Sequence, residues 1–213
     1  MLTVHHLGIS QSERIVWLCE ELGLPYELRR YDRDPQTQLA PSDYRALHPF
    51  GTAPVITDGE LVLAESGAII EYLLAKHGGS TLAVASGEPE FADYLFWFHF
   101  ANGSLMPSLI ADLFVARLGE AADPALVRAM QARSQRAFAM IERRLGEVDY
   151  FAGQRFTAAD IIMLFPLTTL RYFLRRELTQ FPSLRAYLAR IGARPAYQRA
   201  MRKAEPGMTP LLS

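Results

Sequence analysis

Two serines near the amino end are the first residues whose type and position could do chemistry. Ser10 and Ser12 lie in the stretch SQSER, between a strand-like run and a helix-like run. A hydroxyl at a helix start can donate a hydrogen bond to an anion, and the helix dipole acts in the same direction. Ser10 and Glu13 also spell a capping box, in which Ser10 accepts from a backbone N–H near Glu13. Ser12 competes for both roles, so chemistry and capping both stay open.

A second pair of candidates is Glu65 and Ser66, in the stretch AESGAII. They stand where a predicted strand ends and a predicted helix begins. The free N–H groups of a helix start bind anions, and the Ser66 hydroxyl adds one more donor. The neighbouring Glu65 carboxylate can accept from an ammonium group, so the pair suits an α-amino-acid zwitterion. The alternative is that Ser66 only caps the helix.

Pro54 stands directly before a predicted strand. A proline is tolerated at a strand start, because it has no N–H for the ladder. In a cis bond it would turn the chain and leave the backbone groups of Ala53 free to pair with an extended peptide ligand. Both interpretations agree with the sequence.

The elements that must position these residues follow from the pattern of apolar residues. Ile15, Leu18, Cys19 and Leu22 repeat at helical spacing, and Gly23 ends that helix. The dipeptide Asp58-Gly59 between two short apolar runs predicts a hairpin. The predicted order is strand, helix, strand, loop, strand, strand, helix, with strands at 2–7, 25–31, 55–57 and 61–64.

The remainder of the chain is predicted to be helical. Glycines, serines and Pro89 indicate a linker, after which long amphipathic segments follow, and Pro107 is expected to bend or interrupt the first of them. We therefore expect an α/β domain over 1–78, a linker over 79–89 and an all-α domain over 90–213.

Composition narrows the class of protein. The 213 residues carry a formal net charge of −1, which offers no basic field for nucleic acid or anionic membrane. The amino end lacks a secretory signal pattern, and no apolar run approaches the ~18 residues of a membrane span. Cys19 is the single cysteine, which suits a reducing compartment, and the histidines show no metal-ligand spacing. A cytoplasmic protein without a metal is expected.

The motifs described above resemble those of the cytosolic glutathione transferases. SQSER, HPFGTAPVI and LAESGAIIEYL resemble the family's glutathione-binding half. YFAGQRFTAADIIM and FPSLRAYLARIGARPAYQRAM resemble its helical half, and FWFHFANGSLMPSL resembles a bacterial and fungal subgroup. The resemblance implies a thioredoxin-like amino-terminal domain with a cis proline, an all-α carboxy-terminal domain and a homodimer. It also implies glutathione as co-substrate and a serine-type enzyme, with detoxification as its role.

The resemblance assigns roles to the first candidates. Ser10 matches the serine that stabilises the glutathione thiolate, and Pro54 matches the cis proline, with Thr52 and the Ala53 backbone beside the cysteinyl part of glutathione. Glu65 and Ser66 match the pair that holds the γ-glutamyl end. Lowering a thiol pKa by about two units needs roughly 2.7 kcal/mol of preference for the anion. A hydroxyl donor and a helix amino end can together supply that order of energy.

In the helical half, an aromatic face is expected to border the electrophile site. Its residues are Tyr94, Phe98 and His99, with Asn102 one turn on; core or dimer packing is the alternative for each of them. The residue that holds the glycine carboxylate of glutathione is left open among Arg33, His48 and Gln38.

These interpretations predict an enzyme that adds the glutathione thiolate to apolar electrophiles. The alternatives are glutathione-dependent reduction of peroxides or disulfides, and a non-catalytic ligand- or protein-binding module of the same fold. Thr157 and Asp160 form a capping box in FTAAD, so we expect their role to be structural.

Overall fold

The computed structural model describes residues 1–77, 81–121 and 123–213. The chain divides into two compact units. The first comprises Met1–Ala83 and Ile191–Pro210, and the second comprises Val84–Arg190 and Leu211–Ser213.

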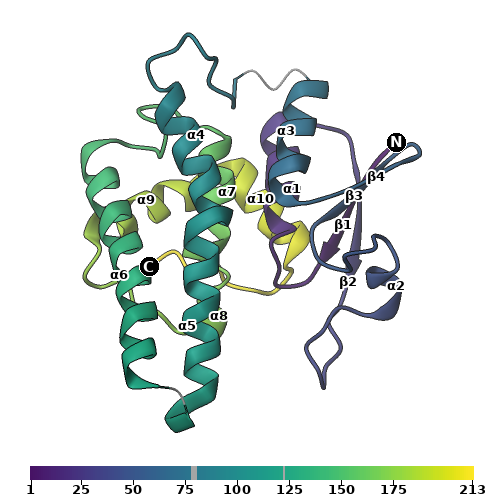
Figure 1. The fold of residues 1–213 in the computed structure, drawn as a ribbon. Coiled ribbons are helices and arrows are strands. Elements are labelled where there is room, and N and C mark those ends of the chain that lie inside the picture. The colour runs from purple at the N-terminus through teal and green to yellow at the C-terminus, as the bar shows by residue number, and fades with distance from the viewer. Residues whose placement is uncertain (78–80, 122) are drawn as a thin grey trace. The chain divides into compact units, whose positions relative to one another are not determined.

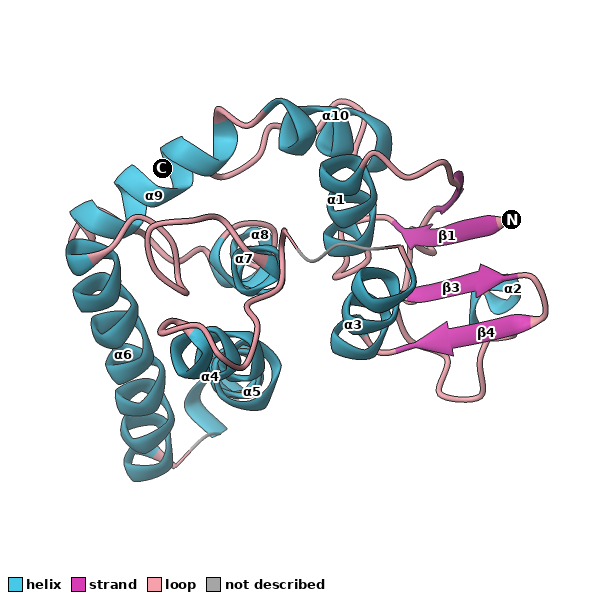
Figure 2. Ribbon diagram, turned by 90° about the horizontal axis from the view of Figure 1, so that it is seen from above, coloured by secondary structure: helices cyan, strands magenta, loops and turns pink. Residues whose placement is uncertain are grey.

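The first unit is built on a four-stranded mixed sheet with the strand order β2-β1-β3-β4. Its strands are β1 (Leu2–Leu7), β2 (Glu27–Tyr31), β3 (Val55–Asp58) and β4 (Leu61–Ala64). β1 pairs parallel with β2 and antiparallel with β3, and β4 completes the predicted hairpin. The helices α1 (Glu13–Leu22) and α3 (Ser66–Lys76) cover one face, and the short α2 (Ser42–Arg45) lies on the other (Figure 2). This is the thioredoxin-like arrangement that the resemblance implied.

Helix α1 follows from the apolar stripe in its sequence. Ile15, Leu18 and Cys19 are completely buried, and the helix ends at Gly23 in the left-handed conformation with φ 62°. The Gly23 N–H donates to the carbonyl of Cys19, a common way to satisfy the last turn of a helix. Burial and the nearby Glu20 carboxylate raise the pKa of the Cys19 thiol to about 12, so this cysteine is a packing residue.

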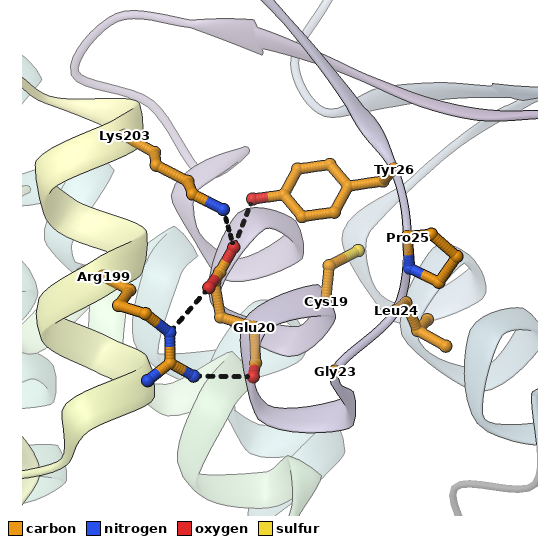
Figure 3. A pocket seen from close by; sticks show the side chains of 8 residues that line it. All are labelled: Cys19, Glu20, Gly23, Leu24, Pro25, Tyr26, Arg199 and Lys203. Atoms are coloured by element: carbon orange, nitrogen blue, oxygen red, sulfur yellow. Dashed lines mark hydrogen bonds and ion pairs between the residues drawn. The ribbon is translucent and has the colours of Figure 1, made fainter.

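The last helix, α10 (Pro195–Ala204), belongs to the first unit because it packs against α1 (Figure 1). The Glu20 carboxylate accepts from Arg199 Nε at 2.9 Å, Lys203 Nζ at 2.5 Å and the Tyr26 hydroxyl at 2.8 Å. Figure 3 shows both cations reaching from α10 toward this carboxylate, around a pocket of about 370 Å³. This charge cluster links α10 to α1.

The division by contacts therefore differs from the boundaries expected from the sequence, which grouped residues 90–213 together. Its physical reason is the packing of α10 against α1, which combines apolar contact with the pairing of acidic groups on α1 and basic groups on α10. A second pair, Glu21 with Arg194 at 2.7 Å and 2.8 Å, adds to the Glu20 cluster.

The second unit is helical. Its helices are α4 (Phe91–Phe100), α5 (Met106–Leu118), α6 (Pro124–Glu147), α7 (Ala158–Leu167), α8 (Arg171–Leu174) and α9 (Pro182–Gly192). A π-helical stretch, Ala101–Leu105, joins α4 to α5, and Pro107 lies in the first turn of α5. The backbone stays helical across this junction, so next to Pro107 the hydrogen-bond pattern changes from π to α, and the expected interruption is not a break in the helix. Residues 79 and 80 of the predicted linker lie outside the described residues, and its remaining part consists of turns and irregular chain.

Helix α7 is buried along its whole length and begins with the capping box expected from the sequence. The Asp160 carboxylate accepts four hydrogen bonds: from the N–H groups of Phe151 and Thr157 and from the hydroxyls of Thr157 and Tyr187. Burial raises the pKa of Asp160 to about 6, against the effect of these donors. The role of this box is structural, as predicted.

Within the part of the chain that the structure describes, none of the helices combines the length and the apolar character needed to cross a membrane. The same described ranges contain no group of three His, Cys, Asp or Glu side chains that could hold a metal ion.

We expect Asp160→Asn to lower the free energy of unfolding by about 2–3 kcal/mol. The reason is that the amide NH₂ of asparagine would face buried hydrogen-bond donors, and an NH₂ group cannot accept a hydrogen bond. The measurement is urea unfolding at neutral pH. The matched control is Asp123→Asn, since Asp123 is an exposed N-cap of α6 that accepts from Ala125 N–H, and asparagine caps equally well.

The same pair of proteins tests the electrostatics of Asp160. In the folded protein the pKa of Asp160, about 6, lies above its value in the unfolded chain. Protonated Asp160 therefore stabilises the folded state near pH 4, and this contribution is lost as the pH rises through 6. The stability difference between wild type and Asp160→Asn should therefore narrow as pH rises from about 4 to 7. If Asp123→Asn and Asp160→Asn lowered the free energy of unfolding equally, the stabilising role of the buried hydrogen bonds to Asp160 would be contradicted.

Candidate active site

The register of the strands brings the candidate residues to one end of the sheet. His5 pairs with Val55, and Val55 pairs with Ala64. The carboxyl end of β1, the start of β3 and the carboxyl end of β4 therefore meet. The segments attached to these three ends contain Ser10, Thr52 to Pro54, and Glu65 with Ser66.

At the start of β3, the peptide bond between Ala53 and Pro54 is cis, as the resemblance implied. Pro54 is buried, Ala53 is half-buried and Thr52 is exposed. The ladder between β1 and β3 runs only from Leu2–Asp58 to His5–Val55, so the backbone of Ala53 lies beyond its end. An extended ligand can pair with backbone groups at such a position.

The Ser10 side chain is buried, with 4% of its surface exposed. Its hydroxyl lies 2.6 Å from the carbonyl oxygen of Leu7 and 2.7 Å from Ser12 Oγ. It accepts from the Ser12 N–H at 3.3 Å. The N-cap position of α1 is occupied by Ser12 and not by Ser10, and the Ser12 side chain makes no cap hydrogen bond. The reason is that both hydroxyls turn inward, toward the end of β1.

The loop that carries Ser10 is held from several sides. Gly8 N–H donates to the carbonyl of Tyr31 at 2.9 Å. Arg33 donates to the carbonyls of Gly8, at 2.8 Å, and Ile9, at 3.0 Å. Ile9 has a φ of 52°, an uncommon conformation for a β-branched residue that costs on the order of 1–3 kcal/mol. These contacts keep the strained backbone in place.

Three residues were expected as possible partners of a carboxylate ligand, and the structure gives all three of them other hydrogen bonds. Arg33 shapes the loop through Gly8 and Ile9 and also donates to the Gln38 carbonyl at 2.9 Å. The Gln38 side-chain amide donates to the Pro35 carbonyl at 3.2 Å. His48 is half-buried, and its Nδ1 accepts from the Phe50 N–H at 3.3 Å.

Glu65 and Ser66 lie at the start of α3. The helix begins at Ser66, and Glu65 occupies the N-cap position, so the alternative of Ser66 as the cap is wrong. Glu65 is exposed and has a φ of 71°, a strained conformation for a residue with a side chain. Ser66 is buried, and its hydroxyl accepts from Arg14 Nη1 at 3.2 Å.

Arg14 was missed as a site residue by the sequence prediction. Its guanidinium is completely buried, donates to Gln11 Oε1 as well as Ser66, and links the start of α1 to the start of α3. Desolvation lowers its pKa to about 9, while the neighbouring Glu13 carboxylate acts in the opposite direction. A buried cation beside a serine hydroxyl and a helix amino end favours a carboxylate ligand.

His6 and Glu205 were also missed. His6 Nδ1 lies 2.8 Å from Ser12 Oγ, and its Nε2 lies 3.1 Å from Glu205 Oε1. The same carboxylate oxygen accepts from Ile9 N–H at 2.5 Å. A histidine within a buried strand needs polar partners. The position of His6 in a predicted strand was the one feature of the sequence that could have indicated this contact.

The four residues expected in the helical unit lie along one stretch of chain. Tyr94 and Phe98 are buried, with ring centroids 5.8 Å apart. His99 is exposed, and its ring lies 5.4 Å from that of Phe98. Asn102 is half-buried within the π-helical stretch.

Comparison with known proteins decides the family. Residues 10–76 match the model of the glutathione S-transferase amino-terminal domain, and residues 105–195 match that of the carboxy-terminal domain. Glutathione S-transferase 3 of Schizosaccharomyces pombe is 34% identical over 228 residues, covering 100% of this chain and 92% of that protein. The chain belongs to the glutathione S-transferase family.

Solved structures of glutathione S-transferases agree with this assignment. One from Actinobacillus pleuropneumoniae has a TM-score of 0.87 and 34% identity, covering 96% of this chain and 93% of that one. A glutathione transferase family member from Pseudomonas fluorescens, solved with two glutathione bound, has a TM-score of 0.78 and 26% identity, with 94% and 92% coverage. The chain is thus a transferase of this family, whose co-substrate is glutathione. The observed fold is the family's two-part fold.

The strain at Glu65 can be measured by comparing two substitutions. We expect Glu65→Gly to be more stable to urea than Glu65→Ala by about 1–3 kcal/mol, because only glycine adopts a φ of 71° without steric cost. Glu60 supplies the control, since it is exposed and is not among the positive-φ residues. There the alanine variant should equal or exceed the glycine variant in stability. The same order at both positions would show that Glu65 is unstrained.

Proposed function

We propose that this protein conjugates the glutathione thiolate to apolar electrophiles, with Ser10 as the residue that stabilises the thiolate. The observation that carries the proposal is the meeting of three segments at one end of the sheet. These segments provide a serine hydroxyl after β1, open backbone before β3, and an anion-binding helix start after β4. A tripeptide needs these three kinds of contact for its thiol, its backbone and its amino-acid end.

The γ-glutamyl end of glutathione would lie at the start of α3. Its carboxylate would accept from the Ser66 hydroxyl and the first N–H groups of the helix, beside the buried charge of Arg14. Its ammonium would contact the Glu65 carboxylate. The burial of Arg14 and its hydrogen bond to Ser66 support this assignment.

The cysteinyl part would pair with the Ala53 backbone, next to Thr52 and Pro54, and carry the sulfur toward Ser10. For the Ser10 hydroxyl to donate to the thiolate, its proton must turn away from the Leu7 carbonyl, 2.6 Å away. The oxygen can keep accepting from the Ser12 N–H during that turn, because a hydroxyl both donates and accepts.

The electrophile would be held by the helical unit, with Tyr94, Phe98, His99 and Asn102 as the residues that contact it. The aromatic side chains give apolar contact area, and Asn102 carries an amide within the π-helical stretch. The biological role that follows is detoxification in the cytoplasm.

Replacing Ser10 with alanine tests the thiolate assignment. We expect kcat/KM for an aryl halide to fall tenfold or more, equivalent to about 1.4 kcal/mol of transition-state stabilisation. The control is Ser42→Ala, an exposed serine at the start of α2, which should keep its activity. Circular dichroism and urea unfolding should show that both variants are folded. Unchanged turnover in Ser10→Ala would reject the assignment.

Calorimetric titration with glutathione separates the proposed enzyme from its alternatives. Absence of binding up to several millimolar would favour a non-catalytic module. Binding with turnover of peroxides or mixed disulfides, and none of aryl halides, would favour a reductase that uses the same activated thiol.

We also propose that the protein is a homodimer. Several large apolar side chains on α4 and α5 are exposed in the single chain, which is typical of a surface covered by a partner. They are Leu95, Phe96, Ile110, Phe114 and Leu118. Sedimentation equilibrium at micromolar concentration should give twice the chain mass of 23.9 kDa. A mass of one chain would contradict the proposal.

A further inference from the structure

A continuous line of buried polar groups connects Ser10 to a carboxylate. Ser10 Oγ lies 2.7 Å from Ser12 Oγ, and Ser12 Oγ lies 2.8 Å from His6 Nδ1. On the other side of the ring, His6 Nε2 lies 3.1 Å from Glu205 Oε1. All four residues are at least 95% buried. A buried polar network of this kind is costly unless every member has a partner.

For a His6 ring that carries one proton, the donors along the line can be assigned. Glu205 Oε1 accepts from the Ile9 N–H, and as a carboxylate it also accepts from His6 Nε2–H. The proton of this neutral ring is then on Nε2, so Nδ1 must accept from the Ser12 hydroxyl. Ser12 Oγ in turn accepts from the Leu7 N–H at 3.1 Å. The Ser10 proton has two acceptors within reach, the Leu7 carbonyl at 2.6 Å and Ser12 Oγ at 2.7 Å, and the relay begins when this proton turns from Leu7 to Ser12.

We propose that this line is a proton relay that takes up the thiol proton of glutathione when the thiolate forms. The thiol gives its proton to Ser10 Oγ while Ser10 passes its own proton to Ser12 Oγ. Ser12 passes its proton to His6 Nδ1. One S–H bond is broken, one N–H bond is formed, and both hydroxyls are regenerated. The products are a thiolate and a His6 imidazolium, and after conjugation the reverse transfers return the proton to solvent at Ser10.

The surroundings of His6 suit such a charge. Glu205 places a carboxylate directly against the ring, so the imidazolium would form a buried ion pair. The nearby cations have other roles: Arg33 binds loop carbonyls, and Arg30 donates to the Ala204 carbonyl at 3.0 Å and pairs with Asp32 at 2.9 Å. His6 and Glu205 are therefore positioning residues that act on the sulfur through the two serines.

The orientation of the hydroxyls is the consequence that matters for catalysis. With His6 doubly protonated, Nδ1–H donates to Ser12, Ser12 donates to Ser10, and Ser10 donates to the thiolate. Every hydrogen bond in the line then points toward the negative sulfur. Charge-assisted hydrogen bonds are about twice as strong as neutral ones, so the relay both removes the proton and strengthens the donor.

The first test counts protons in the wild-type protein. Glutathione is titrated by calorimetry at about pH 6.5 in buffers of different ionisation enthalpy, while ultraviolet absorbance confirms that the thiolate forms. The relay predicts that close to zero protons reach the buffer per thiolate formed, because His6 keeps the proton. Release of close to one proton would overturn the relay. S-methylglutathione, which has no thiol proton, provides the baseline.

The second test uses variants that interrupt the line. In Ser12→Ala and His6→Gln, the midpoint of the thiolate absorbance titration should rise by about one pH unit, a tenfold loss of thiolate below the midpoint. The matched control is His5→Gln in the same strand, because His5 contacts Tyr31 Oη at 3.0 Å and Thr57 Oγ1 at 3.3 Å instead of the relay. This control should keep the wild-type midpoint.

Binding of S-methylglutathione distinguishes a proton relay from a purely structural role of His6 and Ser12. If His6 and Ser12 act on the proton, their variants should bind S-methylglutathione within about twofold of wild type while the thiolate midpoint moves. Equal losses in both measurements, or an unmoved midpoint, would overturn the relay. The inference rests on the proposed function. If neither ligand binds to the wild-type protein, the proposed function fails; if both bind but the proton count or the midpoint contradicts the relay, the relay alone fails.

Discussion

The carboxylate of Glu205 is the interaction on which the arrangement at the end of the sheet depends. It accepts from the Ile9 N–H in the loop after β1 and lies against His6 within β1, so it ties the loop to the strand. Without it, the strained backbone at Ile9 would lose a hydrogen bond, and His6 would be buried with one ring nitrogen unsatisfied. Such losses typically cost 1–3 kcal/mol for each buried group. The position of Ser10 therefore depends on a residue 195 positions later in the chain.

Glu205 reaches this place because it directly follows α10, and α10 is fixed to α1 by charge pairs. The Glu20 cluster in Figure 3 lies toward the carboxyl end of α1, whereas Ser10 lies just before its amino end. Lys203 of this cluster precedes Glu205 by two residues, so the charge pairs also hold the segment that carries Glu205. Arg199 and Lys203 are about half exposed, so each ion pair by itself contributes little to stability. The packing of α10 on α1 therefore depends on the number of ion pairs and on the apolar contact between the helices.

The sequence predicted the elements better than the contacts between them. The strands, the hairpin, the end of α1 at Gly23 and the capping box at Thr157 follow from local rules of spacing, turn chemistry and helix caps, and all are observed. Ser12 and not Ser10 occupies the N-cap position of α1, and both hydroxyls bond to groups at the end of β1, the Leu7 carbonyl and the His6 ring. Arg14, His6 and Glu205 were missed because their partners are distant in sequence, and no local pattern encodes such pairs. The cis bond and the family came from resemblance, which carries tertiary information that composition lacks.

The membership of α10 in the first unit has a consequence for biosynthesis. Strands β1 to β4 leave the ribosome early, yet the helix that braces them is translated after the whole helical unit. Domains usually fold as units in the order of translation. Here the nascent first unit lacks α10, and one side of α1 is uncovered, until residues near 205 emerge. The time spent in that state is set by translation of more than a hundred intervening codons.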